Sequence, residues 1–234
     1  MLGLQDEVSY RFSRWDPKNP DKYVGTAEDW NRVETAMQTI LSDLGIEHSE
    51  AWGEAAFYGP KLDVQGKNVH GKEDTLFTVQ IDFALATRFD MIYIDENGEK
   101  ARPIIIHRSS IGCYERTLAM LIEKYNGAFP MWLAPEQVRV LSLTDRTCDV
   151  AKSVRDKLFD MGLRAEVDVR SEKLGKKIRE AQLEKVPYIL VIGDKEAEQN
   201  VVAVRHRTDG DLGVMSVDDF AKLALMEVAT KQIK

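Results

Sequence analysis

A dense group of polar side chains lies between His107 and Arg116. His107 follows the apolar run 104–106, and Arg116 comes four residues after Gly112. A neutral imidazole at the end of a strand can coordinate a metal. An arginine above a sheet can bind phosphate or stack on a base through its planar, charged guanidinium. A plain strand-to-helix connection with a solvent-exposed Arg116 explains the residues taken alone equally well.

A second group combines Tyr58 and Lys61 with Gln80. Tyr58 and Lys61 lie in a Gly/Pro loop that enters a strand, and Gln80 shares one face of a later strand with Asp82. These side chains can line a pocket, but a packed Tyr58 and a half-exposed Gln80 are the simpler interpretation. The sequence has neither a G-x-G-x-x-G after a strand nor a G-x-x-x-x-G-K-[ST] loop. If the protein binds a nucleotide, it would therefore use a different type of binding site.

The first half of the chain must position both groups. Its patterns predict an amphipathic helix over 27–44, a helix over 114–125 and a series of strands joined by turns. The expected strands are 8–12, 61–65, 76–82, 91–94 and 103–107. Asn97-Gly98 is expected to form a hairpin turn between the last two. These patterns predict an α+β domain with an antiparallel sheet.

The second half alternates strands with helices of about a dozen residues. Strands are expected over 137–143, 164–169, 188–192 and 201–205, and a helix over 147–161. Ser171 and Ser216 are candidate N-caps of two further helices. Alternation of this kind predicts an α/β domain with a mixed, mostly parallel sheet. Pro130 and Pro135 mark the change, so we predict domains at 1–133 and 134–234.

Composition excludes several protein classes. The 234 residues carry 32 basic and 39 acidic side chains, a net charge of −7, which argues against a general DNA-binding coat. No run approaches the roughly 18 apolar residues of a membrane span, and the first residues do not resemble a signal peptide. Cys113 and Cys148 are too far apart for a cysteine zinc motif and suit a reducing cytosol.

Ordered blocks along the chain resemble the C-terminal part of threonyl-tRNA synthetases, which are class II aminoacyl-tRNA synthetases. The resemblance extends over nearly the whole chain from about Phe57. Its blocks in the first half are Phe57-Tyr58-Gly59-Pro60-Lys61, Thr78-Val79-Gln80-Ile81-Asp82-Phe83, Ile106-His107-Arg108 with Gly112-x-x-Glu115-Arg116, and Phe129-Pro130-x-Trp132-Leu133-Ala134-Pro135. Those in the second half are Arg170-Ser171-Glu172-Lys173-Leu174-Gly175, Val186-Pro187-Tyr188, Gly193-Asp194-Lys195-Glu196 and Asp211-Leu212-Gly213.

The resemblance implies a reaction and a set of residues. Members of the family activate threonine with ATP, taken with Mg²⁺, and transfer threonyl to tRNA(Thr) in the cytoplasm as homodimers. Arg116, in the block that resembles motif 3, would bind ATP as the catalytic arginine. Tyr58, Gln80 and Lys61 would line the threonine and adenylate pocket. His107 would be one of three protein ligands of a zinc ion that distinguishes threonine from valine by its hydroxyl.

The second half would bind the anticodon. Glu196 and Arg205 match family positions that contact anticodon bases, where a carboxylate accepts and an arginine donates to base edges. The stretch 170–185 holds six basic residues against three acidic ones. A solvated helix face is the plain interpretation of that charge, and tRNA is the partner that the resemblance implies.

The chain also departs from the family pattern. The other two zinc ligands, motif 1 with its dimer interface, and motif 2 with another ATP-binding arginine would all precede Met1. Neither Cys113 nor Cys148 matches the missing cysteine ligand by position. We therefore expect a fragment that is inactive alone. The alternative is a non-catalytic tRNA- or RNA-binding regulatory module. A prolyl or histidyl enzyme with a similar tail is a third hypothesis, disfavoured by the Phe57–Lys61 block and His107.

Overall fold

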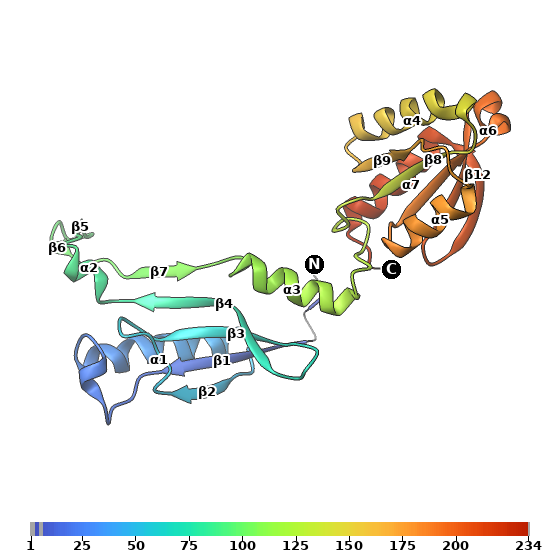
Figure 1. The fold of residues 1–234 in the computed structure, drawn as a ribbon. Helices are drawn as coiled ribbons and strands as arrows, with labels where there is room; N and C mark the ends of the chain where they lie inside the picture. Colours follow the sequence, from blue (N-terminus) through green and yellow to red (C-terminus); the bar gives the residue numbers. More distant parts are fainter. Residues whose placement is uncertain (1–2, 5–6, 234) are drawn as a thin grey trace. The chain divides into compact units, whose positions relative to one another are not determined.

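The computed structural model describes residues 3–4 and 7–233, and residues 1–2, 5–6 and 234 lie outside the description. Packing divides the described chain into two units, with the division between Met120 and Leu121 inside helix α3, Tyr114–Tyr125. The two units are described separately below, and Figure 1 shows their elements. The expected domains 1–133 and 134–234 remain a prediction.

The first unit is built on a five-stranded sheet with the order β2-β1-β3-β4-β7. Its strands are β1 Val8–Arg14, β2 Ser49–Trp52, β3 Lys61–Lys67, β4 Glu73–Asp82 and β7 Ile105–Arg108. The β1–β3, β3–β4 and β4–β7 pairs are antiparallel, and only β1–β2 is parallel. The predicted antiparallel sheet is confirmed. Helix α1, Ala27–Asp43, begins at a capping box between Thr26 and Asp29.

Alternation along the strands gives this sheet an apolar face and a polar face. Phe12, Leu62 and Ile81 pack with Met37 and Leu41 of α1. Their neighbours along the strands, Ser13, Asp63 and Gln80, fall on the opposite face, because successive side chains alternate. One face therefore holds the helix, and the other presents polar groups.

The predicted hairpin at Asn97-Gly98 forms with a different partner from the one expected. Gly98 has φ +78°, as such a turn requires, but it joins β5, Tyr93–Ile94, to β6, Lys100–Ala101. The later strand β7 pairs with β4 instead. The expected partner of 91–94 was therefore wrong, because a turn motif indicates a reversal but not how far the following strand extends. Helix α2, Leu85–Arg88, and strand β2 were not predicted.

The second unit holds another five-stranded sheet, ordered β12-β11-β10-β8-β9. Its strands are β8 Val138–Ser142, β9 Ala165–Asp168, β10 Tyr188–Ile192, β11 Val201–His206 and β12 Gly210–Ser216. Strand β11 is antiparallel to both its neighbours, and the other four share one direction. The predicted mixed, mostly parallel sheet is confirmed. Its helices are α4 Cys148–Asp160, α5 Leu174–Leu183, α6 Asp194–Gln199 and α7 Val217–Thr230, and short 3₁₀ turns lie at Pro20–Lys22 and Asp145–Thr147.

The two expected N-caps of the second unit have different outcomes. Ser216 accepts a hydrogen bond from the Asp219 amide and caps α7. Helix α5 instead begins after Lys173, whose side chain makes no capping bond, so Ser171 is not its cap. Helix α5 consequently starts two residues later than a serine cap at 171 would place it.

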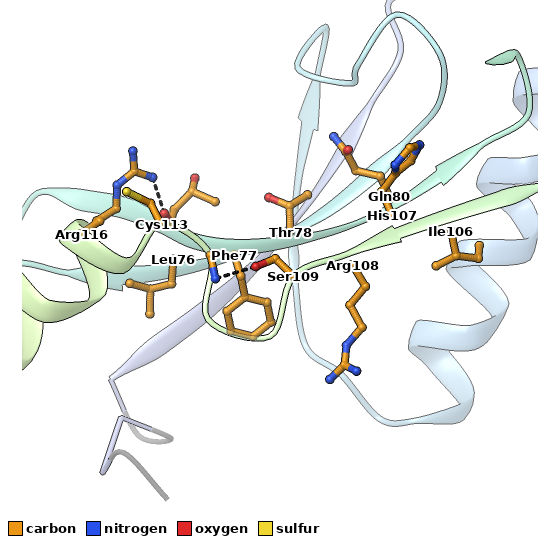
Figure 2. Close-up of a pocket in the computed structure, with 12 residues that line it drawn as sticks. Leu76, Phe77, Thr78, Gln80, Ile106, His107, Arg108, Ser109, Cys113 and Arg116 are labelled. Atoms are coloured by element: carbon orange, nitrogen blue, oxygen red, sulfur yellow. Dashed lines mark hydrogen bonds between the residues drawn. The ribbon is translucent and has the colours of Figure 1, made fainter. Parts of the chain in front are cut away.

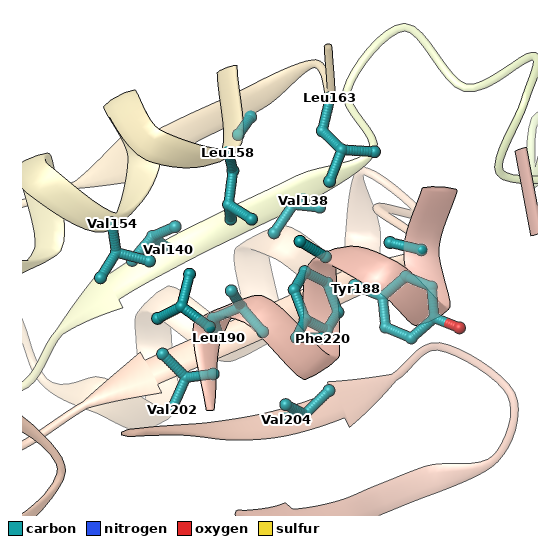
Figure 3. Close-up of a cluster of buried hydrophobic side chains, with 14 of the residues drawn as sticks. Val138, Val140, Val154, Leu158, Leu163, Tyr188, Leu190, Val202, Val204 and Phe220 are labelled. Carbon is teal, nitrogen blue, oxygen red and sulfur yellow. The ribbon is translucent and has the colours of Figure 1, made fainter. Parts of the chain in front are cut away.

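Buried aliphatic and aromatic side chains fill the second unit on both faces of its sheet. Figure 3 shows the larger cluster, in which Val138, Val140 and Leu190 of the sheet meet Leu158 of α4 and Phe220 of α7. On the other face Leu141 and Ile189 pack with Ala181 of α5. Each face is thus covered by a helix, as expected for an α/β domain.

The segment before β8 packs into the second unit. Met131 is fully buried in its larger core cluster, and Arg207 donates to the carbonyl oxygens of Ala128 and Phe129 at 3.2 and 2.9 Å. The Lys185 ammonium also donates to the carbonyl oxygen of Asn126. Residues 126–133 are therefore part of the folded second unit rather than a free linker.

Candidate functional site

A pocket of about 640 Å³ opens on the polar face of the first sheet, over β4, β7 and the start of α3. Figure 2 shows Gln80 and His107 at one end of it and Arg116 at the other. Its lining residues are Thr75, Leu76, Phe77, Thr78, Gln80, Ile106, His107, Arg108, Ser109, Gly112, Cys113 and Arg116. Three of the residues predicted from the sequence, which come from three different elements, therefore meet at one cavity.

A row of predicted residues crosses three adjacent strands. In the strand register Lys61 of β3 is opposite Gln80 of β4, and Gln80 is opposite His107 of β7. Directly opposed residues of antiparallel strands share a face, so the three side chains leave the sheet on the same side. The structure therefore groups residues that are 46 positions apart in the sequence, from 61 to 107.

Tyr58, in the loop before β3, contacts two residues at this end of the pocket. Its hydroxyl donates to Gln80 Oε1 at 2.8 Å, and its ring centroid lies 5.5 Å from that of His107. The hydrogen bond fixes the orientation of the Gln80 amide, leaving its Nε2 as a donor to a ligand. Tyr58 itself does not belong to the lining of the pocket but holds two residues that do.

His107 is held by a buried carboxylate. Its Nε2 lies 2.8 Å from Asp82 Oδ2, and Asp82 is fully buried. The other oxygen of Asp82 accepts from the amides of Ala84 and Leu85 at 3.0 and 2.9 Å. Asp82 thus fixes the orientation of the imidazole and leaves Nδ1 as its second nitrogen. Its place beside Gln80 was visible in the sequence, but its role was not.

The described residues do not fit a complete zinc site. Within 3–4 and 7–233, no group of three or more His, Cys, Asp or Glu side chains is placed to hold a metal ion. A catalytic zinc takes three protein ligands, and His107 supplies one imidazole. The residues present therefore carry no metal chemistry by themselves.

Arg116 lies on the first turn of α3 with its guanidinium exposed at the pocket. Its Nη1 donates to the carbonyl oxygen of Thr75 on β4. The other guanidinium nitrogens are left to bind an anion, for which a planar array of donors is well suited. Beside it, the Cys113 thiol donates to Glu115 Oε2 at 3.0 Å and holds the pKa of the Glu115 carboxyl below its ordinary value.

The turn between β7 and α3 depends on Gly112. Its φ is +76°, and a Cβ at this position would lie 1.8 Å from the carbonyl oxygen of Leu76 on β4. The Gly112 amide donates to Ser109 Oγ at 2.6 Å. The close approach of backbone to backbone brings the start of α3 onto β4 and so places Arg116 over the pocket.

Lys61 is directed to a neighbour on its own strand rather than into the pocket. Its ammonium lies 2.8 Å from Asp63 Oδ2, and the buried Asp63 also accepts from the hydroxyls of Ser13 and Thr78. Asp63 was not singled out from the sequence, although residues two apart on a strand share a face. Lys61 adjoins the row of pocket residues but does not line the pocket.

The two predicted residues of the second unit occupy different elements. Glu196 lies on α6, where its Oε2 accepts from the amide of Gly193 at 2.9 Å. Half-buried Arg205 lies on β11 opposite Ile189, whose side chain packs against α5. Arg205 therefore lies on the α5 side of the sheet. Its guanidinium has no hydrogen-bonding or ion-pair partner among the described residues.

Much of the basic stretch 170–185 is engaged within the protein. Arg170 pairs with Asp168 and Glu180, each at 2.6 Å, and Lys176 pairs with Glu172 at the same distance. Lys177 is buried and donates to the carbonyl oxygens of Ser142 and Asp168 at 2.9 and 3.2 Å. With Lys185 bound to Asn126, the basic side chains left exposed and unpaired in the described stretch are Lys173 and Arg179.

Comparisons with known proteins agree with both units. Residues 23–125 match the tRNA synthetase class II core domain (G, H, P, S and T), and residues 137–226 match an anticodon binding domain. None of the helices in the described ranges is long and apolar enough to span a bilayer.

The proteins that are similar in sequence are named threonine–tRNA ligase, and a similar solved structure is named threonyl-tRNA synthetase. A threonine–tRNA ligase of Clostridium botulinum is 62% identical over 99% of this chain and 36% of its own length. That of Listeria monocytogenes is 50% identical over 95% of this chain and 35% of its own length. A crystal structure of the RNA-binding domain of threonyl-tRNA synthetase from Cryptosporidium parvum superposes with a TM-score of 0.86 at 32% identity, covering 94% of this chain and 55% of that one. The chain spans about a third of these curated relatives, and it belongs to the threonyl-tRNA synthetase family as the end of the class II core followed by the anticodon-binding domain.

Proposed function

We propose that this chain supplies part of the active site and the anticodon-binding domain of a threonine–tRNA ligase. The enzyme activates threonine with ATP to threonyl-adenylate and transfers threonyl to tRNA(Thr). One observation carries the proposal: Gln80, His107 and Arg116, far apart in the sequence, line one open pocket in a chain that is 62% identical to a threonine–tRNA ligase.

The chemistry of the pocket residues supports adenylate formation. Arg116 offers donors to the phosphates of ATP and a planar surface for adenine, so its contribution is positioning and charge neutralisation. Gln80, oriented by Tyr58, offers its amide to threonine or the adenylate, and Lys61 adds positive charge beside it. His107 offers one imidazole to a zinc ion, whose other two ligands would come from a part of the enzyme outside this chain.

The second unit supports recognition of tRNA(Thr). Arg205 is the strongest candidate for a base contact, because its guanidinium has no partner among the described side chains. Glu196 keeps Oε1 available to accept from a base while Oε2 caps α6. Lys173 and Arg179 offer phosphate contacts. A homodimeric, cytoplasmic enzyme is part of the same proposal.

To test the proposal, this chain is fused to the part of the Clostridium botulinum relative that it does not span. Threonine-dependent exchange of pyrophosphate into ATP is expected for the joined protein. Removing a preorganised charge donor should cost about 100-fold, so Arg116→Ala is expected to reduce exchange by that factor. Arg32→Ala, at an exposed arginine of α1, is the matched control and should leave the rate unchanged. No exchange in the joined protein would contradict the proposal.

The chain alone is expected to be inactive in this exchange, because its pocket is open and its metal ligands are incomplete. A non-catalytic tRNA-binding module is the second candidate function, favoured by the lack of a complete metal-binding group within the described residues. Tight binding of tRNA(Thr) by the isolated chain, together with no exchange by the joined protein, would favour it.

A further inference from the structure

The pairing of β3 with β4 is interrupted by one extra residue on β4. The register places Val64 of β3 opposite Phe77 of β4. The next residue, Gln65, lies opposite Thr75, so the pairing passes over Leu76. In an unbroken register Gln65 would be opposite Leu76, and the β-bulge puts Thr75 there instead. Bulges are over-represented next to active sites, where they re-aim side chains, and this one lies in the part of β4 that lines the pocket.

A buried pair of side chains fixes the bulge. Gln65 is only 2% exposed and does not line the pocket. Its Nε2 donates to Thr75 Oγ1 at 2.8 Å, and the Thr75 hydroxyl donates back to Gln65 Oε1 at 3.2 Å. A buried amide requires such partners, because it is removed from water. The pair therefore holds residue 75 in the register that the bulge creates.

Arg116 and the turn before it contact the main chain of β4 at this bulge. The carbonyl oxygen of Thr75 accepts from Arg116 Nη1, and among the residues that the structure describes it is the one hydrogen-bonding partner of this exposed guanidinium. The next carbonyl oxygen, that of Leu76, lies against the turn, where a Cβ on Gly112 would be 1.8 Å away. Both contacts thus fall on the residues of the bulge.

We propose that Gln65 is a positioning residue for Arg116. The inference rests on the proposed function, which assigns Arg116 to ATP. Gln65 fixes Thr75, and the Thr75 carbonyl oxygen fixes one edge of the guanidinium, so the other nitrogens are held ready for the triphosphate. A prealigned guanidinium spares ATP the entropic cost of ordering a long side chain on binding. A residue outside the pocket thereby sets how well the pocket binds and aligns ATP.

The first experiment measures the mobility of Arg116 in the 234-residue chain by NMR relaxation of its side-chain Nε–Hε group, assigned with Arg116→Lys. Gln65→Leu removes both hydrogen bonds at similar side-chain size, and Thr75→Val removes the hydroxyl alone. Each should lower the order parameter of Arg116, and the second variant decides the outcome if the first does not fold. Gln137→Leu, at a similarly buried glutamine (1%) with two hydrogen bonds in the second unit, is the matched control and should not.

The second experiment measures exchange of pyrophosphate into ATP by the joined protein. A misplaced positioning group costs up to about 100-fold, so Gln65→Leu is expected to lower kcat/KM for ATP about tenfold. The KM for threonine should stay unchanged, and Gln137→Leu should alter neither value. In an Arg116→Ala background Gln65→Leu should have no further effect, because the side chain through which it acts is already absent.

Two outcomes would overturn the inference. One is an order parameter of Arg116 that neither Gln65→Leu nor Thr75→Val changes. The other is an equal loss of exchange from Gln65→Leu with and without the Arg116 side chain, since Gln65 would then act on the pocket by another path. A joined protein that exchanges no pyrophosphate would contradict the proposed function, and the NMR comparison would still decide whether Gln65 positions Arg116.

Discussion

Two glycines with nearly the same φ differ in what surrounds them. Gly112 has φ +76° and Gly71 has φ +75°, but a Cβ would meet the Leu76 carbonyl oxygen at 1.8 Å only at Gly112, and nothing within 4 Å at Gly71. Gly71→Ala should therefore cost only the left-handed conformation, about 1–2 kcal/mol. Gly112→Ala should cost clearly more, because the turn must move away from β4. Urea unfolding of both variants checks this; equal losses would contradict it.

Asp168 gives the second unit an acid-dependent contribution to stability. Hydrogen bonding from Arg170 holds the pKa of the Asp168 carboxyl below its ordinary value of 3.8. Below about that pH the unfolded chain takes up a proton that the folded chain does not, so the free energy of unfolding falls as the pH falls. Asp168→Asn should lose stability at neutral pH and show a smaller fall in the free energy of unfolding as the pH drops below about 4. An unchanged slope would count against this role.

The sequence predicted the members of the pocket better than their contacts. Of the residues singled out, Gln80 and His107 on strands and Arg116 on α3 line the pocket, and Tyr58 contacts two of them from a loop. Lys61 was grouped with them, but it pairs with Asp63. Lys61 and Asp63 are two positions apart on β3 and so share a face, but spacing alone does not show which neighbour a long, flexible side chain will contact.

At the scale of elements, Lys177 joins three parts of the second unit. This lysine of α5, only 2% exposed, donates to carbonyl oxygens at the ends of β8 and β9. Lys177→Met removes both bonds, and a buried acceptor without a donor costs about 1–3 kcal/mol. We expect a loss of about 2–4 kcal/mol, measured by urea unfolding. Lys173→Met, at the exposed cap position, should change stability little; similar losses for both would show that burial of Lys177 is not the cause.

Helices and strands with a strong hydrophobic periodicity were predicted well, and the pairing of strands was predicted less well. Helix α1, with its apolar face, and the first four strands of the second unit follow from local patterns, whereas strand β12 and helix α6 were not predicted. Strand β2 was missed because Ser49–Trp52 is short and polar, and its parallel pairing with β1 is set by the fold. The same limit explains why the turn at Gly98 was located correctly and its partner strand was not.

At the scale of the molecule, the position of the boundary between the two domains can be tested by experiment. Met131 lies in the core of the second unit, and Arg207 binds the carbonyls of Ala128 and Phe129. A fragment of residues 126–234 should therefore be more stable than one of 134–234, by about 2–5 kcal/mol for the lost methionine alone. Thermal and urea unfolding of the two fragments provide the comparison. Equal stability would support the boundary predicted at residues 133 and 134.

Two glycines also pack their main chain closely against strand β4, which lines the pocket. A Cβ at Gly59 would lie 1.7 Å from the Ile81 carbonyl oxygen, and one at Gly112 would lie 1.8 Å from that of Leu76, so β4 is fixed by main-chain contacts on both sides of Thr78. Part of the frame of the cavity is thus set by main-chain contacts, in addition to the hydrogen bonds of Thr75 and Thr78 with buried Gln65 and Asp63. A library randomising Thr75, Thr78 and Gln80 should retain folded proteins with altered ligand preference, whereas one that includes either glycine should be depleted of folded members.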